Sequence, residues 1–289
     1  MKIVVLGSGG QLGRDLTPRL PGDVLPWTRA EADLTRPREL RAALAAARPD
    51  VVVNCAAYNL VDRAESTPED AFAVNAWGVR DLAAACRDLD CTLVHFSTDY
   101  VFGRDAGRRT PWAETDAPGP CSVYGLSKWV GERLVRESCP RHFVVRTCGL
   151  YGVWGSGGKG GNFVETMLRL AGQGKPLRVV TDQTCTPTYT ADLAAAVAAL
   201  LPTGRYGLYH LTNAGACTWH EFAAAIFELA GVAADLTPIS SAQYGAAARR
   251  PAYSVLANAA YAAAGLPPLR PWREALAAYL GERNRRNRT

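Results

Sequence analysis

The sequence is poor in lysine, histidine and methionine, and it lacks the patterns of several common classes of protein. Only four of its 32 basic residues are lysine, and it has four histidines and two methionines. No run of eighteen apolar residues occurs, so we expect no membrane-spanning helix. The short apolar stretch at the N-terminus is unlike a signal peptide. We therefore expect a cytoplasmic protein that does not associate with a membrane.

Eight cysteines are present, but none forms a C-x-x-C pair, and no histidine is spaced from another as metal ligands are. Several lie in apolar runs, as Cys55 does, so we expect reduced thiols in the core and no metal site. Much of the net charge of +5 comes from a basic C-terminal tail, expected to be frayed and solvated, with Arg283, Arg285, Arg286 and Arg288. No basic stripe interleaved with aromatic residues occurs upstream, which argues against a nucleic-acid partner.

Short apolar runs alternate with amphipathic stretches over the first half of the chain. The runs typical of buried strands lie at 3–6, 24–27, 51–54, 92–97 and 143–146. The helical patterns between them lie at 11–20, 37–47, 69–87 and 124–137. Such alternation predicts an α/β fold with a Rossmann-like, doubly wound parallel sheet.

After Thr147 the alternation becomes irregular, and glycines crowd residues 149–161. Further strand or helix patterns lie at 163–171, 177–180, 190–201, 207–211, 218–230 and 271–280. We predict two units, a Rossmann domain that binds the cofactor and a smaller, discontinuous C-terminal lobe that binds the substrate. The predicted Rossmann domain comprises 1–148 and about 176–213, and the predicted lobe comprises about 149–175 and 214–289.

A glycine-rich turn follows the first predicted strand and opens the first predicted helix. Gly7, Gly10 and Gly13 let the backbone turn tightly and approach a pyrophosphate, while the first N–H groups of the helix point at the phosphates. Plain strand–helix turns also contain this spacing. Its place at the start of a βαβ unit nevertheless favours a dinucleotide site.

The end of the second predicted strand bears on the choice between NADP and NAD. An NAD site places a carboxylate there for the ribose 2′-hydroxyl, whereas an NADP site offers a cation to the 2′-phosphate. Here Thr28 and Arg29 occupy that place. They favour NADP(H), although Glu31 follows two residues later and leaves NAD(H) open.

Tyr124 and Lys128 begin another predicted helix and lie one turn apart on the same face. A phenol titrates near ~10, so it needs help to exchange a proton at neutral pH. A neighbouring ammonium stabilises the phenolate, and we expect Lys128 to lower the pKa of Tyr124 toward ~7. In a chain with so little lysine, this pair predicts proton transfer beside a bound nicotinamide.

Polar residues end the fourth predicted strand, where side chains of an open α/β sheet face the ligand. Thr98 can donate to a substrate carbonyl oxygen, and Asp99 can hydrogen-bond a sugar hydroxyl. The same residues also suit the start of a turn. We expect His95 to lie within the strand, packed in the core.

In combination these motifs resemble the extended short-chain dehydrogenase/reductase superfamily and, within it, the dTDP-4-dehydrorhamnose reductase family. The likeness spans nearly the whole chain. Besides the motifs above, it includes Gln11-Leu12, Asp33-Leu34, Ala56-Ala57-Tyr58, Ser97-Thr98-Asp99-Tyr100, Asn162-Phe163, Asp182-Gln183 and Ala248-Arg249-Arg250-Pro251.

The resemblance implies NADPH-dependent reduction of the C4 ketone of a dTDP-4-dehydro-6-deoxyhexose. Tyr124 would be the general acid, Lys128 its partner, and Thr98 the group that polarises the ketone. The cofactor residues would further include Gln11, Leu12, Asp33, Leu34, Ala56, Ala57, Tyr58 and Ser97. The nucleotide-sugar residues would be Thr98, Asp99, Tyr100, Asn162 and Arg249.

Two positions depart from the family pattern. A tryptophan that packs near the hexose usually follows Arg-Thr-Ser/Ala, but here Gly149 follows Cys148, and Trp154 is the candidate replacement. Ala191 stands where the family's magnesium-linked dimer contact needs an acidic residue, so a monomer and a homodimer both remain open.

Two other functions stay open on the sequence. One is a related nucleotide-sugar reductase or epimerase acting on another hexose; an epimerase would retain bound NAD. The other is a non-catalytic NADP-binding subunit, because the regulatory subunit of methionine adenosyltransferase is similar in sequence. The intact Thr98, Tyr124 and Lys128 argue against a purely binding role.

Overall fold

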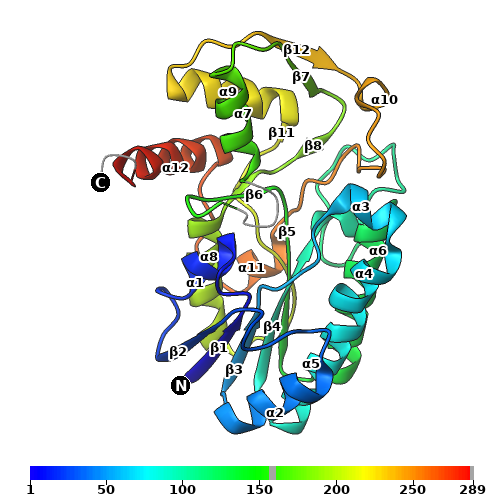
Figure 1. Cartoon of the computed structure of the whole chain (residues 1–289), viewed down its shortest axis with the longest axis vertical. Coiled ribbons are helices and arrows are strands. Elements are labelled where there is room, and N and C mark those ends of the chain that lie inside the picture. The colour runs from blue at the N-terminus through cyan, green and yellow to red at the C-terminus, as the bar shows by residue number, and fades with distance from the viewer. Residues whose placement is uncertain (156–160, 287–289) are drawn as a thin grey trace.

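The computed structural model describes residues 1–155 and 161–286 of the chain (Figure 1). A parallel sheet of six strands forms the centre of the larger unit. In spatial order its strands are β2 (Asp23–Trp27), β1 (Lys2–Leu6), β3 (Val51–Asn54), β4 (Thr92–Thr98), β5 (His142–Thr147) and β10 (Gly207–His210). Because β2 and β3 lie on opposite sides of β1, the winding reverses there, and ligands of such sheets bind at the carboxyl ends of the strands at this reversal.

Helices cover both faces of the sheet, which confirms the predicted α/β fold (Figure 1). Alternate residues of β1 belong to two separate cores, with Ile3 and Val5 in one and Val4 and Leu6 in the other. The first core includes helices α1 (Gln11–Leu16), α8 (Thr190–Leu200) and α11 (Ala259–Ala263). The second includes α2 (Pro37–Ala47), α5 (Gly78–Asp88) and α6 (Val123–Ser138).

The helix predicted at 69–87 is three successive helices. They are α4 (Pro68–Phe72), the π-helical η1 (Ala73–Trp77) and α5. The remaining short helices of this unit are α3 (Val61–Ser66), η2 (Asp99–Val101) and η3 (Leu201–Thr203). Among the described helices, none combines the length and the apolar character that a membrane span requires. All eight cysteines are free thiols, and six of them are buried.

A second, smaller unit packs around its own apolar core. Its helices are α7 (Phe163–Ala171), α9 (Trp219–Ala230), α10 (Ser241–Tyr244) and α12 (Trp272–Arg286). Its short strands, and those that lead into it, are β6 (Leu150–Tyr151), β7 (Leu177–Val180), β8 (Thr184–Cys185), β9 (Thr188–Tyr189), β11 (Cys217–Thr218) and β12 (Leu236–Ile239).

The domain boundaries predicted from the sequence stay a proposal, with one adjustment. β7 pairs with β12, and its Leu177 and Val179 lie in the core of the smaller unit. By contrast, α8 packs on the large sheet, and β10 is a strand of that sheet, paired with β5. We therefore propose to move residues 177–180 from the Rossmann domain to the lobe.

We expected the basic tail to be frayed, and for the residues up to 286 this expectation was wrong. Helix α12 continues to Arg286, and Arg283 pairs with Glu165 at 2.5 Å. Arg288 lies outside the described residues. Arg283 and Arg286 have acidic and aromatic partners in the fold, which favours the continuation of the helix to this point.

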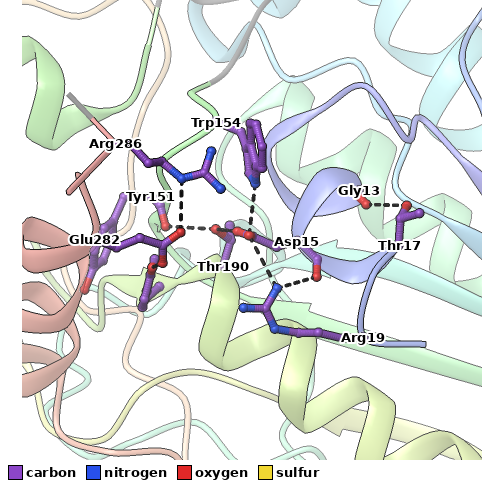
Figure 2. A network of polar contacts seen from close by, with 10 residues as sticks. Gly13, Asp15, Thr17, Arg19, Tyr151, Trp154, Thr190, Glu282 and Arg286 are labelled. Carbon is purple, nitrogen blue, oxygen red and sulfur yellow. Dashed lines mark hydrogen bonds and ion pairs between the residues drawn. The ribbon is translucent and has the colours of Figure 1, made fainter. Parts of the chain in front are cut away.

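A polar network joins the end of α12 to α1 (Figure 2). The buried Asp15 of α1 accepts hydrogen bonds from the Thr190 hydroxyl at 2.5 Å and from the Trp154 indole at 3.2 Å. The Arg286 guanidinium lies 3.7 Å from the centroid of the Trp154 ring and 3.3 Å from a Glu282 carboxylate oxygen. These contacts tie the smaller unit to the helix that begins at the glycine turn.

Candidate active site

The glycine turn lies at the carboxyl ends of β1 and β3. Gly7 has a φ of +70°, and a β-carbon there would lie 2.8 Å from the backbone nitrogen of Ala56. A β-carbon at Gly13 would lie 2.5 Å from the Gly7 oxygen. Gly10, the residue before α1, is exposed and makes no side-chain cap, so no side chain at this position covers the start of the helix. This arrangement fits a dinucleotide pyrophosphate.

Ser97, the last residue but one of β4, supplies a second observation that fits a cofactor. Its hydroxyl is buried, and within the described chain it has no hydrogen-bond partner. A buried hydroxyl without a partner is costly, so a ligand that hydrogen-bonds it would stabilise the site.

The residues predicted at the adenosine ribose lie together after β2. The Glu31 carboxylate accepts from both the backbone nitrogen and the hydroxyl of Thr28, each at 2.7 Å. Arg29 is 82% exposed and pairs with Asp33 at 2.8 Å. Partial burial raises the pKa of Asp33, but hydrogen bonds from Thr35 and the pairing with Arg29 outweigh it and bring the pKa to about 2. An exposed cation and a hydroxyl therefore lie beside the glycine turn.

The segment 56–58 is held between the glycine turn and α6. The Ala56 backbone nitrogen donates to the Asn54 side chain at 3.1 Å. Asn75, in the π-helix, bonds both backbone groups of Tyr58 at 2.9 Å and also donates to the Ser127 hydroxyl at 3.0 Å. The structure thus places Ala56 beside Gly7 and links Tyr58, through Asn75, to α6, the helix that contains Tyr124 and Lys128.

Tyr124 lies in the first turn of α6, whose start is firmly capped. The Ser122 hydroxyl accepts from the Gly125 backbone nitrogen at 3.1 Å, and Glu65 accepts from the Val123 nitrogen at 2.9 Å. The Thr98 hydroxyl hydrogen-bonds the half-buried phenol of Tyr124. The structure therefore brings the predicted proton donor and the predicted ketone-polarising hydroxyl together.

The pKa of Tyr124 is raised, and the expectation that Lys128 lowers it was wrong for this structure. Burial raises the pKa of the phenol to about 12; the Thr98 hydroxyl lowers it, and the Asp99 charge raises it. The Lys128 ammonium instead donates to the carbonyl oxygen of Phe96 at 2.6 Å. Burial lowers the pKa of Lys128 to about 8, although Glu132 acts in the opposite direction. At neutral pH the phenol is therefore protonated, which is the state a proton donor needs.

Asp99 is buried and bonded to groups of the protein. It accepts from the Thr98 hydroxyl at 3.0 Å and from the Cys148 thiol at 3.1 Å, and also from Ser254. Burial raises the pKa of Asp99, and these hydrogen bonds lower it. The carboxylate thus holds Thr98 in place. The Tyr100 ring meets the Tyr124 ring edge to face, with centroids 5.8 Å apart.

The two residues predicted on the nucleotide-sugar side have different surroundings. Asn162 caps α7 and donates to the Gly152 oxygen at 2.8 Å and to the Gln11 side chain at 3.3 Å. It therefore links the smaller unit to the glycine turn. Arg249 is exposed, whereas the adjacent Arg250 pairs with Asp62 at 2.7 Å. Their roles toward a substrate stay predictions.

The aromatic replacement predicted for position 149 was misplaced. Trp154 stacks under Arg286 and bonds Asp15, in the network of Figure 2. Gly149 has a φ of +53°, and a β-carbon there would lie 3.3 Å from the end of the Trp219 indole. Trp219, at the start of α9, is therefore the aromatic side chain that approaches this position.

The residues present do not fit the magnesium contact of the family. No cluster of three or more His, Cys, Asp or Glu side chains suited to a metal occurs in the described parts of the chain. Ala191 is apolar, and Asp15 accepts hydrogen bonds from Thr190 and Trp154. We derive no step through a metal.

Several residues of the site escaped sequence reasoning. Asn75 lies in a π-helix that breaks an otherwise helical pattern, and such irregular turns often occur at functional sites. Arg14 donates to the Gly9 oxygen at 3.1 Å, which puts a cation at the glycine turn. The Ser122 cap was readable as a serine before a helix. Glu65 was not, because its contact spans 58 residues.

The phenol–hydroxyl pair and the glycine turn at one edge of a parallel sheet are those of a Rossmann-fold dehydrogenase/reductase. A family model described as the RmlD substrate binding domain matches residues 1–285, and the chain belongs to this family. It is 45% identical to a dTDP-4-dehydrorhamnose reductase of Streptomyces griseus, over 94% of this chain and 91% of that protein.

Two further comparisons bear on the function. The chain is 43% identical to a probable dTDP-4,6-dihydroxy-2-methyloxan-3-one 4-ketoreductase of Streptomyces antibioticus, over 96% of this chain and 93% of that protein. Among solved structures, the dTDP-4-dehydrorhamnose reductase of Bacillus anthracis in complex with NADP has a TM-score of 0.92 and 37% identity. The match covers 97% of this chain and 99% of that one.

Proposed function

We propose that this protein reduces the C4 ketone of dTDP-4-dehydrorhamnose with NADPH, forming dTDP-L-rhamnose. The observation that carries the proposal is the position of the Tyr124 phenol beside the Thr98 hydroxyl, at the carboxyl end of β4. A ketone in hydrogen-bonding reach of both groups has a proton donor and a polarising hydroxyl at its oxygen. Two relatives support the same function: one is named a dTDP-4-dehydrorhamnose reductase, and another, of the same name, was solved in complex with NADP.

The cofactor would lie along the carboxyl edge of the sheet. The backbone of Gly7 to Gly13 would bind the pyrophosphate, and Thr28 and Arg29 would meet the 2′-phosphate. Asp33 and Leu34 would flank the adenine. Ala56, Ala57, Tyr58 and Ser97 would line the path to the nicotinamide, with Tyr124 and Lys128 at its end.

Bound NADPH would supply the hydride for C4, at the two-electron level that the reduction of a ketone requires. Tyr124 gives its proton to the oxygen that becomes the C4 hydroxyl, so the ketone gains one hydride and one proton. In the ligand-free protein the Thr98 hydroxyl donates its one proton to Asp99. With substrate bound, that proton would turn to the C4 oxygen and stabilise the negative charge that develops there. Lys128 stabilises the phenolate left on Tyr124, which then regains a proton from solvent.

The direct test is the consumption of NADPH, followed by absorbance, with dTDP-4-dehydro-L-rhamnose as substrate. We expect turnover with wild-type protein, formation of dTDP-L-rhamnose by mass spectrometry, and loss of at least about 100-fold in kcat for Tyr124→Phe. The Tyr206→Phe variant is the matched control, since it removes a 42%-exposed phenol beside Thr92, at the opposite end of β4. Folded wild-type protein that binds NADPH but reduces no dTDP-4-ketosugar would refute the proposal and favour a binding subunit.

A second candidate is a reductase for another dTDP-4-keto-6-deoxyhexose. Gly149 and the approach of Trp219 to its position favour it, because both alter the wall on which we place the sugar. A panel of dTDP-4-ketosugars separates the candidates by relative kcat/KM. An epimerase would convert a sugar without net consumption of NADPH. A cytoplasmic location and the choice between monomer and homodimer stay predictions.

A further inference from the structure

A buried histidine lies directly beneath Lys128. His95 of β4 is fully buried, and its Nε2 is 3.5 Å from the Lys128 Nζ. On its other side, the Asn54 side-chain amide lies 3.1 Å from His95 Nδ1, since the two residues are register partners in β3 and β4. The three side chains therefore form a continuous chain from the switch point of the sheet to the amine.

The orientation of the Asn54 amide fixes the tautomer of His95. The Asn54 oxygen accepts from the Ala56 backbone nitrogen at 3.1 Å, so the NH₂ group faces the imidazole. An NH₂ group only donates, and His95 Nδ1 must then accept. A neutral imidazole that accepts at Nδ1 carries its proton on Nε2. The opposite tautomer would set two donors against each other.

The Nε2–H of His95 therefore points at the Lys128 nitrogen. An ammonium only donates, whereas an uncharged amine also accepts. The amine form satisfies the whole chain, because it accepts from His95 and donates to Phe96. The charged form leaves the His95 N–H without a partner in a buried site.

We propose that His95 is a positioning residue for Lys128, and that its Nε2–H, fixed by the Asn54 amide, favours the uncharged amine beneath Tyr124. This inference rests on the proposed function in that Lys128 is taken as the partner of the Tyr124 phenol. The contact thus raises the fraction of Lys128 that is uncharged, and this fraction places no positive charge beside the protonated phenol. Movement of Nζ away from His95 then lets the remaining amine take up a proton from solvent and stabilise the phenolate.

Other titratable groups also lie near Lys128, and one of them, Glu132, favours the charged form of the amine. Glu132, one turn further along α6, favours the ammonium, but it is itself paired with Arg146 of β5 at 2.7 Å. Tyr124 lies one turn before Lys128 on the same helix. Burial is the larger cause that lowers the pKa of His95, so its ring stays neutral beside the amine as well as beside the ammonium.

Nuclear magnetic resonance of the ligand-free protein tests the proposal without turnover. The chain has four lysines and four histidines, so ¹⁵N labelling of these residues gives few signals. In wild-type protein at pH 7 we expect His95 as the Nε2–H tautomer. We expect His95→Phe to raise the titration midpoint of Lys128 by about one pH unit, the size of effect that one hydrogen bond produces. His142→Phe is the matched control and should leave that midpoint unchanged.

Asn54→Asp provides a second, nearly isosteric variant. Its carboxylate still accepts from Ala56 but also accepts from His95 Nδ1–H, so we expect the tautomer to switch and the Lys128 midpoint to rise. An Nδ1–H tautomer in wild-type protein, or the wild-type midpoint in His95→Phe, overturns the proposal. Neither readout needs a substrate. If the protein shows no reductase activity, the proposed function is refuted, but the tautomer of His95 and the titration of Lys128 can still be measured and still test the role of His95.

Discussion

The replacement of Lys128 by methionine should stabilise the protein while it abolishes turnover. Lys128 is 2% exposed, and burial lowers its pKa from the ordinary value of 10.5 to about 8. At about 1.36 kcal/mol per pH unit, this difference corresponds to about 3.4 kcal/mol that the folded state loses by holding the ammonium. The lost hydrogen bond to Phe96 offsets about 1 to 1.5 kcal/mol. We expect Lys128→Met to gain about 2 kcal/mol, or about 3 °C in Tm.

The sign of the pH dependence provides a stricter check. The unfolded chain binds the Lys128 proton below pH 10.5, and the folded chain binds it only below about 8. Between these values the unfolded state holds more protons, so wild-type stability rises with pH. The advantage of Lys128→Met is therefore fully developed below pH 8 and shrinks from about 8 to 10.5.

Urea unfolding of wild-type protein and the variant from pH 6 to 10 measures both effects. Lys2→Met is the matched control, because Lys2 also donates to a backbone carbonyl, that of Ala47 at 3.0 Å, but remains partly exposed. We expect it to change stability by no more than about 0.5 kcal/mol. The reasoning is refuted if Lys128→Met is no more stable than Lys2→Met at pH 7, or if its advantage does not vary with pH.

Three other variants test separate parts of the structure. Arg29→Ala should raise the KM for NADPH about tenfold and leave that for NADH unchanged, since only NADPH carries the 2′-phosphate; equal effects in steady-state assays would contradict the assignment. Glu132→Gln leaves the 1%-exposed Arg146 guanidinium without its counter-charge, so we expect the free energy of unfolding in urea to fall by about 3 to 5 kcal/mol. The control Glu39→Gln removes a surface pair and should lower it by less than about 1 kcal/mol. Trp219→Leu should raise the KM for the sugar nucleotide several-fold at constant KM for NADPH, and an unchanged sugar KM would remove Trp219 from the sugar side.

The sheet was predictable because its strands are continuous apolar runs. A strand of a parallel sheet is buried on both faces and has no polar side, so the continuous apolar run at 51–53 predicts such a strand. The helix at 163–171 was predicted with its observed bounds, since Asn162 caps it and an apolar stripe follows. By contrast, β7 is the strand that we propose to move across the predicted domain boundary. Its partner β12 lies 59 residues away, and no local pattern contains that pairing.

In the candidate site, the identities of the reactive residues could be predicted from the sequence, but their protonation states could not. The tyrosine, the lysine and the strand-end threonine could be named from spacing, because the fold places the ends of parallel strands together. The protonation of Tyr124 could not, since it depends on burial and on where the Lys128 ammonium finds its acceptor. That acceptor, the Phe96 carbonyl, lies 32 residues away in sequence.

The same reasoning explains why Lys128 and not Tyr124 is the sensitive group of the ligand-free site. A phenol with a pKa of about 12 stays protonated through the physiological range, so small changes in its surroundings leave its state unaltered. An amine with a pKa of about 8 changes charge within reach of neutral pH, and each contact that it gains or loses shifts that balance. We therefore expect the two groups that touch Lys128, Phe96 and His95, to control when the site can stabilise a phenolate, although neither is within the tyrosine–lysine motif.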